Sequence, residues 1–208
     1  MLITDVVSLA KYSELAGVAA KSNDDAIVAF INLGLIELYG RFPLKVEEVV
    51  ISLVDNETYY AVPSNFLYPL QAFGEASEDS PDDAIPISIN NSDDPLSIYF
   101  NDWKTVQIPA AIDGAYVSII YVAKPDPITK AESLDGVTEI QLPDSLIDCL
   151  LSYVGYRAHL GVKSDSRSEN NAHWQRFERN CNKAQELGVA YPIEELNTSM
   201  RLGNRGFV

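Results

Sequence analysis

The sequence has 208 residues, of which 47% are hydrophobic and 22% are charged, a balance that excludes a disordered chain and is typical of a globular protein. A chain of this length buries roughly 70% of its unfolded surface, so its core needs neither disulfides nor metals. The net charge of −15 repels phosphate and excludes a protein that grips nucleic acid, although it does not exclude one that lets DNA pass.

The charge is distributed unevenly along the chain. Residues 75–103 hold eight acidic side chains and no lysine or arginine, whereas residues 157–183 hold six basic side chains against three acidic ones. No apolar stretch reaches the about 20 residues that a membrane span needs, and the N-terminus lacks the pattern of a secretory signal. We therefore expect a protein that is made in the cytoplasm and has no membrane partner.

The first part of the chain is predicted to hold two helices. A weak helix is expected over residues 4–20, where Thr4 can cap the N-terminus. A stronger helix is expected over residues 24–39, because apolar residues recur there at helical spacing after an N-cap at Ser22 or Asn23. Gly40 and Pro43 follow the second helix and predict its end.

The middle of the chain changes to the period of strands. Residues 46–54 and 58–62 are predicted to form a β-hairpin around the turn at 55–57. An acidic loop follows at 74–83, and further short strands are expected at 85–89, 96–100 and 104–108. The dipeptide Asp113-Gly114 predicts a hairpin turn before the clearest strand, residues 115–123, because glycine accepts a positive φ without strain.

Helical spacing returns after a linker at 130–136. Pro143 indicates the start of a helix, whose apolar stripe ends at Gly161, and a last helix is expected over residues 169–187. The final stretch is rich in loop formers and is predicted to be an extended arm.

These elements predict an α+β fold. We expect the N- and C-terminal helix pairs to form one helical bundle, with an antiparallel β module inserted between them. The predicted domains are 1–43 together with 137–190 for the bundle, 44–136 for the β-rich insertion and 191–208 for the arm.

A catalytic or metal site is not expected. Within one helix, Cys149 and His159 are about 15 Å apart and His173 and Cys181 about 12 Å, at 1.5 Å per residue, too far to share a metal or to form a nucleophile–base pair. A contact between a cysteine and a histidine across helices remains open. The two cysteines are expected to be buried thiols and not a disulfide, and no cofactor is expected.

Two loops carry oxygen ligands that suit calcium, but they lack the spacing of an EF-hand. Their acidic residues are Glu78, Asp79, Asp82, Asp83, Asp93 and Asp94. Many aromatic residues also lie in the β region, where exposed rings would bind carbohydrate. We interpret most of them as core and cross-strand packing.

Four stretches follow one another in a known order. They are AFINLGLIELYGRF with KVEEVVISL, then TYYAVPSNFLYPLQAF, then VSIIYVAKPDPIT, and finally IQLPDSLIDCLLSYVGYRAHLG with NAHWQRFERNC. By order and spacing, nearly the whole chain resembles the head-to-tail connector, or adaptor, proteins of tailed bacteriophages. The resemblance implies a non-enzymatic virion protein at the neck between head and tail.

The resemblance also implies partners. They are further copies of the chain in a dodecameric ring, the portal protein above, tail nozzle or tube proteins below, and double-stranded DNA that passes without specific binding. The acidic loops are candidates for the channel side. The candidate portal- or neighbour-binding arm contains Thr198, Met200, Arg201, Leu202, Arg205 and Phe207.

Two alternatives compete with the adaptor. A tail tubular or tail-completion protein would share the same setting, but its β module should dominate the contacts. A binding module for carbohydrate or calcium belongs to another class, and heat released on adding either ligand would identify it.

Overall fold

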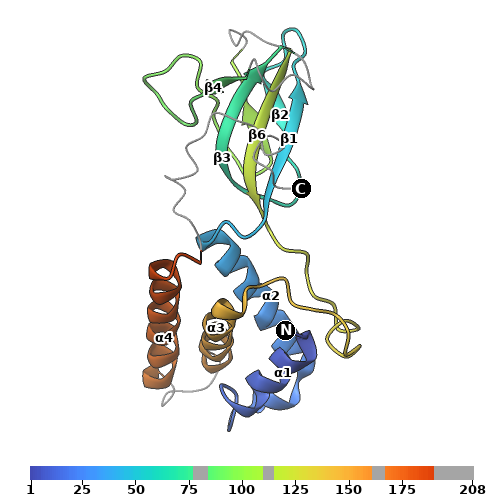
Figure 1. Cartoon of the computed structure of the whole chain (residues 1–208), viewed down its shortest axis with the longest axis vertical. Helices are drawn as coiled ribbons and strands as arrows, with labels where there is room; N and C mark the ends of the chain where they lie inside the picture. Colours follow the sequence, from blue (N-terminus) through green and yellow to red (C-terminus); the bar gives the residue numbers. More distant parts are fainter. Residues whose placement is uncertain (77–83, 110–114, 161–166, 190–208) are drawn as a thin grey trace. The chain divides into compact units, whose positions relative to one another are not determined.

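The computed structural model describes residues 1–76, 84–109, 115–160 and 167–189. Its described residues form two compact units, one from residues 1–42 and 125–189 and the other from residues 43–124 (Figure 1). The first is helical and the second consists of antiparallel strands. The predicted combination of helices with antiparallel sheet, an α+β fold, is therefore confirmed.

The helical unit contains four α-helices. They are α1 (Ile3–Tyr12), α2 (Asp24–Arg41), α3 (Ile147–His159) and α4 (Arg167–Glu186), with short 3-10 turns at Ala19–Ser22 and Asp144–Leu146. Helix α3 contacts each of the other three helices. Apolar side chains from all four helices, such as those of Ile3, Ile27, Leu150 and Phe177, are fully or almost fully buried in its core.

Helix α2 forms as the sequence predicts. The Asn23 side chain accepts a hydrogen bond from the Ala26 amide at 3.2 Å, so Asn23 is the N-cap. The acidic residues in the first turn and Arg41 in the last turn complement the helix dipole.

The prediction for the first helix is partly wrong. Helix α1 ends at Tyr12, and Thr4 lies inside it, because Leu2 occupies the N-cap position without a side-chain hydrogen bond. The chain then turns, with Gly17 at a φ of +91°. This turn buries Leu15 completely, which a straight continuation of the amphipathic helix would not require.

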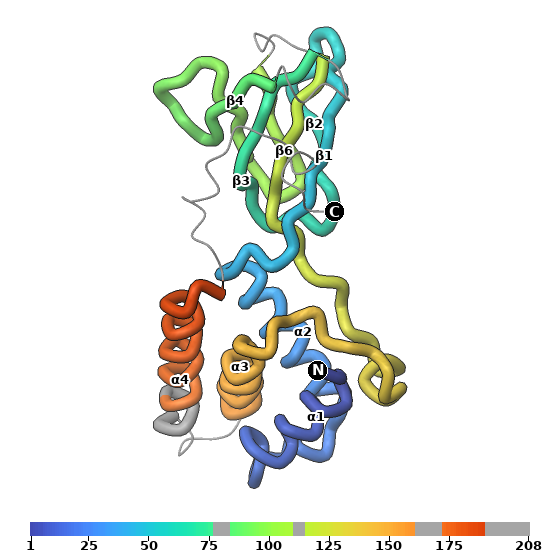
Figure 2. Tube along the Cα trace, in the orientation of Figure 1, coloured from blue at the N-terminus to red at the C-terminus, as the bar shows by residue number. Residues whose placement is uncertain are grey.

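The segment before α3 belongs to the helical unit. Figure 2 shows it as the yellow and gold tube that runs beside α1 and α2. Asn32 of α2 holds it by accepting from the Ile128 amide at 2.8 Å and donating to the Ile128 carbonyl at 2.9 Å. The Ile3 amide also donates to the Thr138 carbonyl at 3.0 Å.

The β unit contains two sheets. The larger has the order β1 (Val46–Ser52), β6 (Tyr116–Ala123), β3 (Phe66–Glu75) and β4 (Ile85–Ile87), with every pair antiparallel. β1 is thus an outer strand and β6 a central one. The smaller sheet pairs β2 (Tyr59–Ala61) with β5 (Thr105–Gln107). Side chains from both sheets share one apolar core, which includes Ile51, Tyr60, Ala72, Val106, Val117 and Ile119.

Both predicted hairpins pair the wrong strands. β1 pairs along seven residues with β6, and β2 pairs with β5 in the other sheet. In place of backbone pairing between the two predicted hairpin strands, the Tyr60 hydroxyl accepts a hydrogen bond from the Val54 amide at 2.9 Å. The Asp113-Gly114 turn lies outside the described residues, and the strands on either side of it belong to different sheets. β6 is apolar and almost wholly buried, which favours a central position between two long strands.

The strand β3 was not predicted. Its ten residues include Pro69, which cannot donate to a ladder and usually excludes a central strand. The register shifts between Phe66 and Tyr68 and again between Pro69 and Gln71, and such irregularities accommodate the missing donor. The predicted strand at 96–100 is also wrong, because this segment forms only isolated bridges through Ile98 and Tyr99.

Candidate functional site

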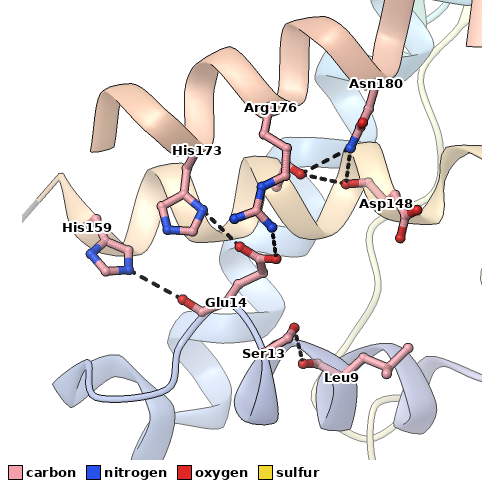
Figure 3. A network of polar contacts seen from close by, with 9 residues as sticks. Leu9, Ser13, Glu14, Asp148, His159, His173, Arg176 and Asn180 are labelled. Atoms are coloured by element: carbon pink, nitrogen blue, oxygen red, sulfur yellow. Dashed lines mark hydrogen bonds and ion pairs between the residues drawn. The ribbon is translucent and has the colours of Figure 1, made fainter. Parts of the chain in front are cut away.

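A buried carboxylate lies where the turn after α1 meets α3 and α4. Figure 3 shows Glu14 reaching from this turn toward α4. Its Oε2 lies 2.8 Å from His173 Nδ1, and its Oε1 accepts from Arg176 Nη1 at 2.7 Å. The Glu14 side chain is only 9% exposed. The backbone oxygen of Glu14 also lies 3.3 Å from His159 Nε2, so this residue joins three segments of the helical unit.

The surroundings of Glu14 favour its ionised form. Burial alone raises the pKa of this carboxyl, because it penalises the charge. The contact with His173 and the positive charge of Arg176 outweigh burial, so the pKa of Glu14 lies below its usual value. The carboxylate therefore acts as an anchor for α4.

Gly155 provides the space for this anchor. A Cβ atom at this position would lie 2.6 Å from His173 Nδ1 and 3.0 Å from Glu14 Oε2. Both distances are shorter than ordinary contacts, so a larger residue would push Glu14 and His173 out of their contact. The two histidine rings, His159 and His173, stack beside it with centroids 4.7 Å apart.

A hollow of about 860 Å³ borders this cluster, and its lining includes Ser13, Gly17 and Ala172. Its ionisable groups contact one another, and the Ser13 hydroxyl donates to the Leu9 carbonyl at 2.6 Å. In the part of the chain that the structure describes, no three His, Cys, Asp or Glu side chains gather where they could hold a metal ion. The arrangement is that of a structural joint.

Removal of the Glu14 charge should destabilise the fold only at pH values at which the carboxyl is ionised. Because the folded pKa is lowered, this stabilisation is present above the ordinary value of 4.5 and is lost as the pH falls through the folded pKa. We expect Glu14→Gln to lower the free energy of unfolding by about 1–2 kcal/mol at pH 6 and by much less at pH 3. Urea unfolding at both pH values measures the difference.

The exposed α4 carboxyl of Glu186 offers a matched control, since Glu186→Gln should change stability little at either pH. If the loss in Glu14→Gln were equally large at pH 3, the substitution would act through packing and not through charge.

A second polar joint links α2 to α4. Arg41 Nη1 and Nη2 donate to the two carboxylate oxygens of Glu178 at 2.9 and 2.8 Å, and its Nε donates to Glu37 at 2.9 Å. The guanidinium also lies 4.6 Å from the centroid of the Phe177 ring. The hydrogen bonds to Glu178 contribute most to raising the pKa of Arg41, and the same contact lowers the pKa of Glu178.

Neither joint was predicted from the sequence. Glu14 lies inside the helix predicted over residues 4–20, and Arg41 lies beyond the helix predicted over residues 24–39. Their partners on α4 are more than 130 residues away along the chain, so no local spacing could reveal these contacts.

Among the described residues, the two histidine rings stack on each other, and the contact with Cys181 lowers the pKa of Cys149. Both cysteines are free and buried, as predicted.

The predicted acidic residues are only partly described. Glu78, Asp79, Asp82 and Asp83 lie outside the described residues, as do all six residues of the predicted arm, Thr198, Met200, Arg201, Leu202, Arg205 and Phe207. Asp93 is exposed, and Asp94 accepts from the Leu96 amide at 2.9 Å. Hydrogen bonds from the Ser88 side chain and this amide lower the pKa of Asp94. The Asp94 carboxylate thus closes a turn.

Most described aromatic residues of the β unit are packed against other groups. The Phe66 ring stacks on those of Phe100 and Tyr121 at 5.2 and 5.1 Å. Burial and the Glu47 carboxylate raise the pKa of Tyr121 to about 12. Tyr59 and Trp103 are exposed.

Among the residues that the structure describes, none of the helices combines the length and the apolar character that crossing a membrane would require.

Comparison with known proteins identifies the family. A search of the curated proteins found no match. The sequence profile of the family described as SU10 adaptor protein matches residues 2–195, which include both structural units. The predicted resemblance to phage adaptors is confirmed, and the chain belongs to the SU10 adaptor protein family of phage head-to-tail adaptors.

Proposed function

We propose that this phage adaptor forms a dodecameric ring beneath the portal, continues the DNA channel and docks the nozzle or tube proteins of the tail. The family match over residues 2–195 carries the proposal. The role is structural and places the protein in the neck of the virion. The polar joints suit this role, because they hold the helices of one unit in fixed positions.

An exposed apolar stripe on α2 supports contact between subunits. Ala29, Leu33, Ile36 and Gly40 lie along one face of the helix and are exposed, with Leu33 at 39% and Ile36 at 43%. The opposite face of α2 is buried in the core. A contiguous stripe of exposed apolar residues on a soluble protein often marks an interaction site. We assign this stripe to the contact with the neighbouring copy in the ring.

The acidic loops are proposed to face the channel, where negative charge would repel the DNA backbone and let it slide. Of the described residues in this stretch, Asp93 is exposed and suits the role, whereas Glu75 is buried at the end of β3. The basic C-terminal arm, residues 198–208, is proposed to order itself on the portal or on the next subunit.

Electron microscopy of the purified chain with and without its portal protein tests the ring. We expect rings with the portal and expect the double substitution Leu33→Asp/Ile36→Asp to abolish them, because two carboxylates would be buried without partners. A chain that ends at residue 197 should fail in the same assay if the arm is required.

Leu160→Asp/Leu187→Asp is the matched control, since it places the same two charges at exposed leucines just beyond α3 and α4. Circular dichroism must show that each variant is folded. Rings of the double variant equal in number to those of the unchanged chain would contradict the assignment of the stripe. A chain that never assembles on the portal would contradict the proposed function.

A further inference from the structure

The helical unit brings the two cysteines of the chain together. Cys149 lies near the start of α3 and Cys181 lies in the second half of α4, and their exposures are 0% and 2%. The neighbour of Cys181, Asn180, donates to the Asp148 carbonyl and to Ser152 Oγ, each at 3.4 Å (Figure 3). These two contacts flank Cys149 and fix the α4 residues around Cys181 against it. Both thiols are buried at this interface between α3 and α4, and each shifts the pKa of the other.

We propose that Cys149 and Cys181 are a latent disulfide pair, which a peroxide converts to an intrachain bond that joins α3 to α4. Thiols on two packed helices can be bridged only when their Cβ atoms approach to roughly 4 Å. The packing of α4 around Cys181 against α3 around Cys149 places the two buried thiols at one interface, so the bond requires only that their Cβ atoms reach this separation. The alternative for an isolated buried cysteine, which is oxidation to a sulfinic or sulfonic acid, is disfavoured when a second thiol is adjacent.

The two thiols are not equivalent, which sets the order of the steps. Cys149 is the third residue of α3, and the positive end of a helix favours a thiolate. The hydrogen bond from Cys181 lowers the pKa of Cys149, whereas the same contact and burial raise the pKa of Cys181. Cys149 is therefore the thiol that reacts first.

In the first step the Cys149 thiolate attacks one oxygen of hydrogen peroxide. The O–O bond breaks, hydroxide leaves, and Cys149 becomes a sulfenic acid. In the second step the Cys181 sulfur attacks the Cys149 sulfur, the S–O bond breaks, and the Cys181 proton joins the departing hydroxide as water. Both sulfurs are oxidised, and the peroxide is reduced to two molecules of water.

Burial determines when this reaction occurs. Neither thiol is open to solvent, so a small oxidant must enter during local opening of the helices, and the reaction should be slow. A reducing cytoplasm would keep the pair reduced. The chemistry does not depend on the adaptor role, but an adaptor leaves the cell within the virion and then meets an oxidising environment.

The experiment treats the folded full-length chain with hydrogen peroxide. Three changes are expected: free thiols counted after denaturation fall from two to none, the intact mass falls by two hydrogen atoms without added oxygen, and peptide mapping finds residue 149 linked to residue 181. The melting temperature should rise by roughly 5–10 °C, because the bond closes a loop of about 30 residues. Dithiothreitol should reverse all of these changes.

The variants Cys149→Ala and Cys181→Ala are the controls. Each keeps one thiol, so neither can form the intrachain bond, and each should gain oxygen or remain unchanged. The test does not depend on their folding, because the unchanged chain gives the decisive result. Added oxygen atoms, disulfide-linked dimers, or two intact thiols in the oxidised unchanged chain would each overturn the proposal.

Discussion

Replacement of Gly34 by leucine is expected to lower the free energy of unfolding by about 3 kcal/mol or more, the largest loss that we expect for a single substitution in this chain. Gly34 lies where α2 packs against α3. A Cβ atom there would lie 2.6 Å from Leu150 Cδ1 and 3.1 Å from Tyr153 Cδ1. Leu150 is fully buried and cannot swing into solvent, so the two helices would have to separate.

The same helix offers the control. Gly40 also lies inside α2, but a Cβ atom there would meet nothing within 4 Å. Gly40→Leu should therefore stabilise the monomer slightly, by up to about 1 kcal/mol, because glycine is a poor helix former. If both substitutions had the same effect, helix propensity and not the contact with α3 would decide stability.

Urea unfolding followed by tryptophan fluorescence measures both variants. Trp174 lies in the helical unit and Trp103 in the β unit. A Trp103→Phe background makes the signal specific for Trp174 and so for the unit in which Gly34 lies. Trp103 is exposed, so this background substitution should change stability little.

Replacement of Arg41 by alanine is expected to cost about 2 kcal/mol. The variant loses the paired hydrogen bonds to Glu178 and the stacking on Phe177, and it leaves the half-buried Glu178 carboxylate without its cation. Arg41→Lys should recover only part of this loss, because lysine keeps the charge but has neither the fork nor the flat surface of the guanidinium. The same fluorescence assay reports on this joint, because Trp174 lies beside Arg41.

Lys130 provides the matched control for Arg41. Its ammonium contacts Asp25 at 2.8 Å, but both side chains are exposed. Exposed ion pairs contribute little to stability, so Lys130→Ala should leave the unfolding curve unchanged. An equal loss in Lys130→Ala and Arg41→Ala would mean that charge alone, and not the buried geometry, holds α4.

Elements whose own residues show a clear local pattern could be predicted from the sequence. Helix α2 has a capping asparagine and regular apolar spacing, and β6 is an uninterrupted apolar run, so both were predicted nearly to the residue. Strand β3 could not be predicted from the sequence, because Pro69 argues against a strand. The register shifts on either side of Pro69 accommodate it in the folded sheet. The predicted hairpins were wrong because closeness along the chain does not decide which strands pair. β1 pairs instead with β6, which offers a ladder of seven residues.

The polar joints show why the candidate site was harder to predict than the helices. Glu14 becomes an anchor only because the chain turns after Tyr12 and because Gly155 leaves space on α3. Neither condition is local to Glu14. The apolar residues of α2 were visible in the sequence, but their division into a buried and an exposed face required the positions of α3 and α4.

The place of β1 at the outside of its sheet affects the solubility of the free subunit. The outer edge of such a strand can pair with the same strand of another copy and lead to aggregation. β1 carries Glu47 and Glu48 side by side, so antiparallel pairing of two copies would bring like charges close together on both faces of the joined sheet. These two carboxylates also have internal partners, Tyr121 and Ser118. The charges that brace the sheet thus also help to keep unassembled subunits apart.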